Sequence, residues 1–126
     1  MARPPSTVLT DAELRVMRVL WARGGEATIG DVCEVFDPPA ARATVQTMLR
    51  ILERKRYVRH RTEGRTFIYR ALVDDEAASQ RAVDHLVERF FDRSEGALVL
   101  RLLDRRGADV ATLKRVRALL DQEDAS

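Results

Sequence analysis

Cysteine and long apolar runs are scarce in this chain of 126 residues. The one cysteine, Cys33, cannot form an intramolecular disulfide, and a single thiol is typical of a protein in a reducing compartment. No apolar run approaches the roughly 20 residues that span a bilayer. The N-terminus also lacks the apolar core of a secretory signal. We therefore expect a cytoplasmic protein without membrane insertion.

The common patterns of catalytic and metal sites are also missing. The chain contains no glycine-rich phosphate loop ending in Lys-Ser/Thr, no Gly-x-Ser-x-Gly elbow and no His-Glu-x-x-His. His60 and His85 lie far apart, and with Cys33 alone they do not give the spacing of a zinc site. We predict that the protein is not an enzyme, binds no metal and needs no cofactor. Cys33 is expected to be a buried, inert thiol.

Charge is unevenly distributed along the chain, although the formal net charge is only +2. Residues 1–73 carry 13 basic and 8 acidic side chains, a balance of +5, whereas residues 74–126 carry 9 and 12, a balance of −3. A basic half is suited to phosphates. We predict a DNA-binding domain over residues 1–73 and a second, helical domain over residues 74–126.

The first half shows the order of elements of a winged helix-turn-helix. Thr10 and Glu13 form a capping box that opens a first helix, and Gly24-Gly25 ends it. Thr28 is suited to cap a short second helix, and Ala27-Thr28 before it could add a short third strand to a hairpin sheet. A third helix over residues 42–55 precedes two strands, residues 57–61 and 65–70, with a predicted turn at Glu63-Gly64. The predicted fold is mainly α with a small antiparallel β-hairpin.

The third helix and the hairpin carry the candidate DNA contacts. Residues 42–70 hold nine basic side chains and two acidic ones. Val45, Met48, Leu49 and Leu52 are spaced as a buried stripe, which leaves a polar stripe outside. Gln pairs with adenine and Arg with guanine, while Thr meets a phosphate or a thymine methyl. The predicted DNA-binding residues are Arg42, Ala43, Thr44, Gln46, Thr47, Arg50, Arg61 and Arg65.

Each of these features also has a purely structural interpretation. A polar stripe is often only a solvated helix face, and an arginine-rich hairpin discourages strand aggregation. Phe67 and Tyr69 share one face of the second hairpin strand and are predicted to be core residues, although Ile68 between them breaks the alternation. The combination of polar helix and basic hairpin favours DNA binding over either feature alone.

The second half reads as three amphipathic helices. The first runs from residue 74 to about residue 91. The second begins at Ser94-Glu95 and covers residues 97–106 up to Gly107. The third begins after Asp109, with residues 122–126 expected to fray. Three short helices form too small a core to be stable alone, so they pack on the first half or on a second copy. The predicted dimerisation residues are Leu86, Phe90, Leu98, Leu102, Leu113, Val116 and Leu120.

In order and spacing, the chain resembles the penicillinase-repressor family of winged-helix transcriptional regulators over nearly its whole length. The matching stretches are residues 9–14, 19–21, 44–49, 63–65 and 97–100, together with Tyr69, Leu119 and Leu120. The resemblance implies a homodimer, held mainly by its C-terminal helices, that binds a palindromic operator and blocks transcription. The family usually has glycine after the lysine that ends the recognition helix, where this chain has Arg56.

The resemblance also implies how repression ends. In the antibiotic-responsive members, a membrane-bound sensor protease triggers cleavage within the fifth helix. That position falls at Arg101-Leu102 here, where those relatives have Asn followed by Phe. The copper-responsive members use a C-terminal cysteine cluster, which is absent because no cysteine follows Cys33. Two other hypotheses remain: a one-component regulator that senses a ligand or an oxidant in its helical half, and a winged-helix protein-interaction module without DNA binding.

Overall fold

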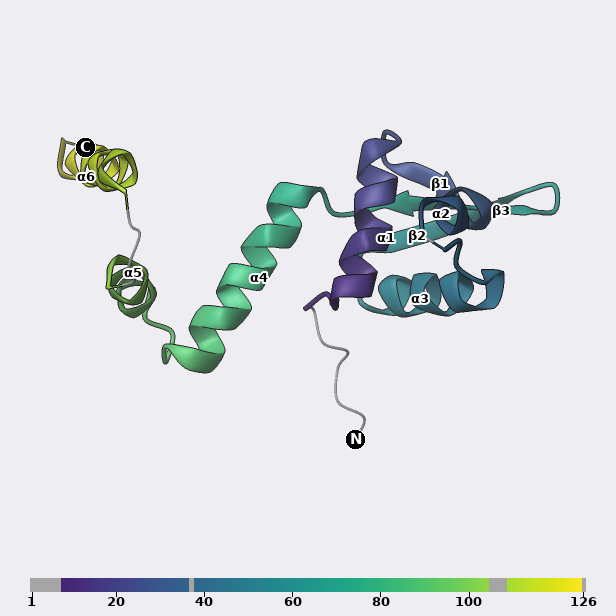
Figure 1. Cartoon of the computed structure of the whole chain (residues 1–126), viewed down its shortest axis with the longest axis horizontal. Coiled ribbons are helices and arrows are strands. Elements are labelled where there is room, and N and C mark those ends of the chain that lie inside the picture. The colour runs from purple at the N-terminus through teal and green to yellow at the C-terminus, as the bar shows by residue number, and fades with distance from the viewer. Residues whose placement is uncertain (1–7, 37, 105–108, 126) are drawn as a thin grey trace. The chain divides into compact units, whose positions relative to one another are not determined.

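The computed structural model describes residues 8–36, 38–104 and 109–125, and the chain divides into two compact units. The first unit lies within residues 1–85 and the second within residues 86–126, so the division falls inside the fourth helix. In order along the chain, the first unit contains α1 (Asp11–Ala22), β1 (Glu26–Thr28), α2 (Ile29–Val35), α3 (Arg42–Arg54), β2 (Val58–Glu63), β3 (Thr66–Ala71) and the start of α4 (Asp75–Phe90) (Figure 1).

Two capping boxes set where α1 and α2 begin. The Thr10 hydroxyl accepts from the Glu13 amide, and the Glu13 carboxylate accepts from the Thr10 amide. Thr28 and Asp31 repeat this arrangement at the start of α2. Each box satisfies two amides that have no partner inside the helix. The predicted capping box at Thr10 and the predicted cap at Thr28 are both confirmed.

The three strands form one antiparallel sheet in the order β1-β3-β2. The predicted third strand is confirmed, because Ala27 of β1 pairs with Tyr69 of β3. Glu63 pairs with Thr66, so the hairpin turn consists of Gly64 and Arg65, one residue later than predicted. Gly64 adopts a φ of 62° at the first position of this turn, a conformation that glycine reaches without steric cost.

The core of the first unit lies between the helices and one face of the sheet. Its fully buried side chains are Val16, Met17, Leu20, Val32, Val45, Leu49, Leu52, Tyr57 and Val58. The predicted stripe of α3 is therefore confirmed, with Met48 only partly buried at its edge. Tyr69 is buried as predicted, but Phe67 is 38% exposed, so its assignment to the core was wrong. Phe67 pairs with Thr62 near the end of the hairpin, which projects beyond α2 and α3 (Figure 1).

The start of α4 packs on the first unit. The indole Nε1 of Trp21 donates to the Val73 carbonyl at 2.8 Å, and Val73 and Ala78 join the buried core. The guanidinium carbon of Arg81 lies 4.8 Å from the centre of the Tyr57 ring. Residues after 73 thus contribute to the fold of the first unit. The domain boundary predicted at residue 73 stays a prediction.

The second unit contains the end of α4, α5 (Glu95–Leu103) and α6 (Val110–Ala125). The Ser94 hydroxyl accepts from the Ala97 amide, so the predicted start of α5 at Ser94-Glu95 is confirmed, but the helix ends at Leu103 rather than near Arg106. The predicted end at Gly107 lies outside the described residues. The Asp109 carboxylate caps α6 as predicted, accepting from the Thr112 amide. The predicted fraying from residue 122 was wrong, because α6 continues to Ala125.

Within the ranges that the structure describes, none of the helices combines the length and apolar character needed to cross a bilayer.

Candidate nucleic-acid interface

One face of α3 is buried and the opposite face is open to solvent. Val45, Leu49 and Leu52 are completely buried, which turns the other stripe of the helix outward. Of the residues predicted to read DNA, only Gln46 is partly buried. The exposed ones are Arg42, Ala43, Thr44, Thr47 and Arg50. The structure therefore places the predicted residues of α3 together along one helical surface.

The start of α3 is positively charged. Its N-cap residue, Ala41, makes no side-chain hydrogen bond to the helix, and the first turn contains Arg42 but no acidic residue. Amide groups at a helix N-terminus favour an anion, and a neighbouring arginine strengthens this preference. Further along the helix, the Thr47 hydroxyl donates to the Ala43 carbonyl at 3.0 Å. Thr47 therefore offers its methyl group and an acceptor oxygen to a partner, rather than its hydroxyl proton.

The end of α3 is fixed by a Schellman motif with arginine in place of glycine. The Arg56 amide donates to the Glu53 carbonyl at 3.0 Å, and the Tyr57 amide donates to the Leu52 carbonyl at 2.9 Å. Arg56 adopts a φ of 67°, in the left-handed region that glycine usually occupies. The helix end thus keeps the geometry of a glycine C-cap even though the sequence departs from the family pattern here.

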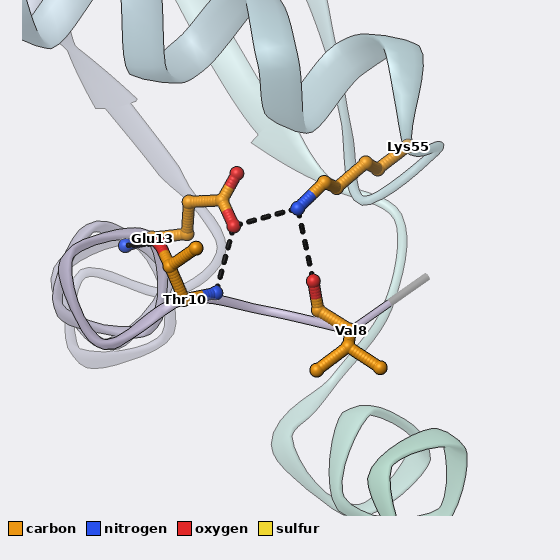
Figure 2. Close-up of polar contacts among 4 residues, drawn as sticks. All are labelled: Val8, Thr10, Glu13 and Lys55. Atoms are coloured by element: carbon orange, nitrogen blue, oxygen red, sulfur yellow. Dashed lines mark hydrogen bonds and ion pairs between the residues drawn. The ribbon is translucent and has the colours of Figure 1, made fainter. Parts of the chain in front are cut away.

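A partly buried ion pair joins the end of α3 to the start of α1. Figure 2 shows Lys55 Nζ reaching Glu13 Oε1 at 2.7 Å and the Val8 carbonyl at 2.9 Å. The same Glu13 oxygen accepts from the Thr10 amide at 2.8 Å (Figure 2). Burial tends to raise the pKa of Glu13, but the hydrogen bonds from Lys55 and Thr10 outweigh it and lower that pKa below its ordinary value. Glu13 is consequently held as a carboxylate.

The hairpin forms a basic wing, and its arginines differ in how many partners they already have within the protein. Arg65 is exposed in the turn itself. Arg61, in contrast, donates from both terminal nitrogens to the Glu26 carboxylate, at 2.8 and 3.1 Å, and from Nε to Glu63 at 3.2 Å. These hydrogen bonds, of which the one to Glu26 has the largest effect, raise the pKa of Arg61 above its ordinary value. Three of the five N–H donors of Arg61 are thus used within the protein, and two carboxylates already offset its charge.

A histidine connects the base of the wing to α3. Nδ1 of His60 lies 2.9 Å from Oε2 of Glu53, in the last turn of α3. The His60 ring also packs edge-on against Phe67, with ring centres 5.4 Å apart, and lies 5.5 Å from the ring centre of Tyr69. The sequence placed His60 in the wing, but it gave no indication of this contact with Glu53. The contact links the orientation of the wing to the end of the helix.

Two further features bear on binding. A cleft of about 560 Å³ lies beside Trp21 in the first unit, and its lining includes Leu14, Tyr57, Ala78 and Arg18. Cys33 is partly buried and packs against the core. Among residues 8–36, 38–104 and 109–125, no three side chains of His, Cys, Asp or Glu come together in a way that could hold a metal ion.

Comparison with known proteins identifies the family. The family model of the penicillinase repressor matches residues 9–122. The chain belongs to the penicillinase repressor family. It is 30% identical over 97 residues to the penicillinase repressor of Bacillus licheniformis, covering 76% of each chain. It is 25% identical over 120 residues to an uncharacterized 16.5 kDa protein of Latilactobacillus sakei, covering 94% of this chain and 82% of the other.

Among solved structures, the DNA-binding domain of the repressor BlaI is similar to this chain. The two are 32% identical, the match covers 61% of this chain and 93% of that domain, and the TM-score is 0.48. The match to the penicillinase repressor family confirms the resemblance inferred from the sequence, and that family consists of DNA-binding winged-helix repressors. The winged-helix fold class is confirmed by the order of elements in the first unit.

Proposed function

We propose that this protein is a transcriptional repressor that binds a two-fold symmetric DNA operator as a homodimer. The observation that carries the proposal is the outward face of α3, where polar and basic side chains line one surface beside a basic wing. This is the arrangement with which a winged helix places one helix in the major groove and its hairpin on the adjoining backbone. Membership of a repressor family supports transcriptional repression as the outcome of binding.

Within this proposal the side chains have different roles. Gln46 and Arg50 contact base edges, because an amide pairs with adenine and a guanidinium pairs with guanine. Thr44 and Thr47 contact a phosphate or a thymine methyl, and Ala43 allows the helix to approach the bases closely. Arg42 and Arg65 bind the phosphate backbone, and Arg61 joins them where the operator displaces Glu26. Backbone contacts fix the register, whereas base contacts carry the sequence preference.

The second unit supplies the dimer in this proposal. Its described helices leave many apolar side chains in solvent, including Phe90 at 70%, Leu102 at 48% and Leu120 at 60% exposure. The other residues predicted for the interface are also not buried: Leu86, Leu98, Leu113 and Val116. Exposed apolar surface of this extent is characteristic of an interaction site. A second copy of the same helices covers this surface. The two DNA-binding units of the resulting dimer are then linked, and they bind an operator more tightly than one unit alone.

The test of DNA binding compares two duplexes at physiological salt. One duplex is selected from a random library with the purified full-length protein, and the other has the same composition in scrambled order. We expect the selected duplex to contain two half-sites about one helical turn apart, roughly 34 Å, or a multiple of this. Affinity should fall steeply with added salt as counterions leave the phosphates. Equal affinity for the two duplexes would exclude specific operator binding, and no binding even at low salt would favour the protein-interaction module.

Release of the operator is proposed to follow cleavage in α5. Arg101 and Leu102, the predicted cleavage position, are both exposed on this helix. A cut there separates α6 and the end of α5 from the rest of the dimerising segment, so each subunit would bind DNA alone. A membrane-bound sensor protease is the partner that the family suggests. Cleavage of a helical bond requires local opening, and a short, exposed helix supplies it at low cost.

The cleavage proposal is tested in cells treated with a cell-wall antibiotic. The repressor is followed by size while expression of its target genes is measured. Appearance of a fragment ending near residue 101 together with derepression supports the proposal. Derepression with a full-length repressor contradicts it.

A repressor released by a small ligand is the second candidate, and the cleft beside Trp21 favours it. The cleft lies in the first unit, between α1 and the start of α4, rather than among the C-terminal helices. Release of the selected duplex from purified, uncleaved protein on addition of a small-molecule pool would distinguish this candidate from proteolysis.

A further inference from the structure

We propose that Glu13 and Lys55 act as a positioning pair that sets the angle at which α3 enters the DNA groove. This inference rests on the proposed function and extends it to residues that do not touch DNA. Glu13 is the only charged side chain found buried in the described part of the chain, with 4% exposure. Its partner Lys55 is the C-cap residue of α3, so the pair holds the recognition helix by its end.

The chemistry of the pair is better suited to positioning than to stability. Removing two charges from water costs about as much as their attraction returns, and apolar side chains of similar size often stabilise a fold equally well. An apolar contact, however, allows sliding. Lys55 Nζ instead donates to two acceptors at defined places, Glu13 Oε1 at 2.7 Å and the Val8 carbonyl at 2.9 Å. These two directed hydrogen bonds hold the helix end in position.

Glu13 is itself held from the other side, which makes the contact rigid. Its Oε1 accepts from the Thr10 amide at 2.8 Å, and its own amide donates to the Thr10 hydroxyl at 3.2 Å. The carboxylate therefore belongs to the capping box of α1 and cannot follow Lys55 if α3 tilts. The end of α3 is thereby held at a fixed position relative to the N-terminus of α1 (Figure 2).

A small tilt of α3 moves both of its ends. At about 1.5 Å of rise per residue, the Ala43 end of α3 lies roughly 18 Å from Lys55. A tilt of about 5° around the middle of the helix moves each end by roughly 0.8 Å, whereas a hydrogen bond tolerates only a few tenths of an ångström. The buried stripe of α3 holds the middle of the helix against the core, and the pair holds its C-terminal end. Loss of the pair should therefore misplace the base-reading side chains while leaving attraction to phosphates intact.

The experiment measures the ratio of affinities for the selected and scrambled duplexes in E13Q/K55M. In this double variant the amide oxygen introduced at position 13 can still accept from Thr10, and no unpaired charge is buried. We expect the ratio to fall about tenfold, the value of one base contact, while affinity for the scrambled duplex stays close to that of the wild type, because the two substitutions remove one positive and one negative charge. Partial unfolding weakens both affinities by the same factor and leaves the ratio unchanged. If the double variant does not fold, E13Q alone is measured in the same way.

Arg54→Met is the control for loss of a cation at this end of α3, because Arg54 is an exposed arginine in its last turn. It removes one positive charge without touching the pair, so both affinities should fall together and the ratio should stay at the wild-type value. A wild-type ratio in E13Q/K55M, or an equal loss of the ratio in Arg54→Met, would overturn the positioning role. A wild-type protein that does not discriminate between the duplexes would instead overturn the proposed function.

Discussion

Replacing Arg56 by glycine should make the protein more stable. Arg56 holds a φ of 67° at the end of α3, and a left-handed backbone costs a residue with a Cβ about 1–2 kcal/mol. Glycine avoids this cost but gives the unfolded chain more freedom, which offsets about 0.4–1 kcal/mol. The Schellman hydrogen bonds of Arg56 and Tyr57 use backbone atoms and are retained. We expect a net gain of about 0.5–1 kcal/mol in the free energy of unfolding.

The gain is measured by urea and thermal unfolding of the full chain at one fixed protein concentration. For a unit of this size the midpoint temperature should rise by roughly 2–6 °C. Arg56→Ala is the control, because it loses the same charge but keeps the Cβ and hence the backbone cost. Its free energy of unfolding should stay close to that of the wild type or below it. If Arg56→Gly were no more stable than Arg56→Ala, the account of this helix end would be wrong.

Three further predictions concern DNA reading, association and acid stability. Arg50→Ala should cost about 1–3 kcal/mol on the selected duplex and relax its sequence preference, whereas Arg65→Ala should weaken all duplexes alike and flatten the salt dependence by about one unit. Indistinguishable profiles of the two variants across a duplex library would contradict these roles. A fragment of residues 1–85, which keeps the start of α4 on the core, should fold, sediment as a monomer and bind the selected duplex far more weakly than the full chain. A full chain that sediments as a monomer at micromolar concentration would exclude the dimer. Because the pKa of Glu13 is lowered on folding, its contribution to stability is fully present above the ordinary value of 4.5 and is lost as the pH falls through the lower folded pKa. The free energy of unfolding, measured in urea at a series of pH values below 4.5, should decrease less for Glu13→Gln than for the wild type. Equal decreases in the two proteins would count against the ion pair.

Local signals in the sequence located most of the fold. The capping box at Thr10, the cap at Thr28 and the buried stripe of α3 depend on residues within one or two helical turns, so their spacing is visible in the chain itself. The short strand at Ala27 was also anticipated. Phe67 was misassigned because alternation along a strand identifies a face, but it does not show how far the helices extend over that face. The end of α6 was misjudged because polar residues near a chain end suit a frayed tail and an exposed helix equally.

The contacts that organise the candidate interface could not be found in this way. Lys55 and Glu13 are separated by 42 positions, and Arg61 and Glu26 by 35. Neither spacing corresponds to a helical or strand period, so only the packed fold brings these side chains together. The sequence correctly identified Arg61 as part of a basic wing, but it did not show that a carboxylate on another strand already holds the guanidinium. The sequence shows which side chains are basic. Whether a basic side chain is free to contact DNA depends on its partners in the folded protein.

The position of Trp21 gives the protein an optical reporter of its own. It is the single tryptophan of the chain, and its indole nitrogen donates to the carbonyl of Val73, where the chain leaves the sheet for α4. Indole emission shifts when this hydrogen bond breaks or when water reaches the ring. Operator DNA can therefore be titrated into unlabelled protein while the tryptophan emission is recorded. A change in emission would show that DNA binding at α3 alters the structure at the start of α4. The same signal would register a small molecule entering the adjoining cleft, without any added dye.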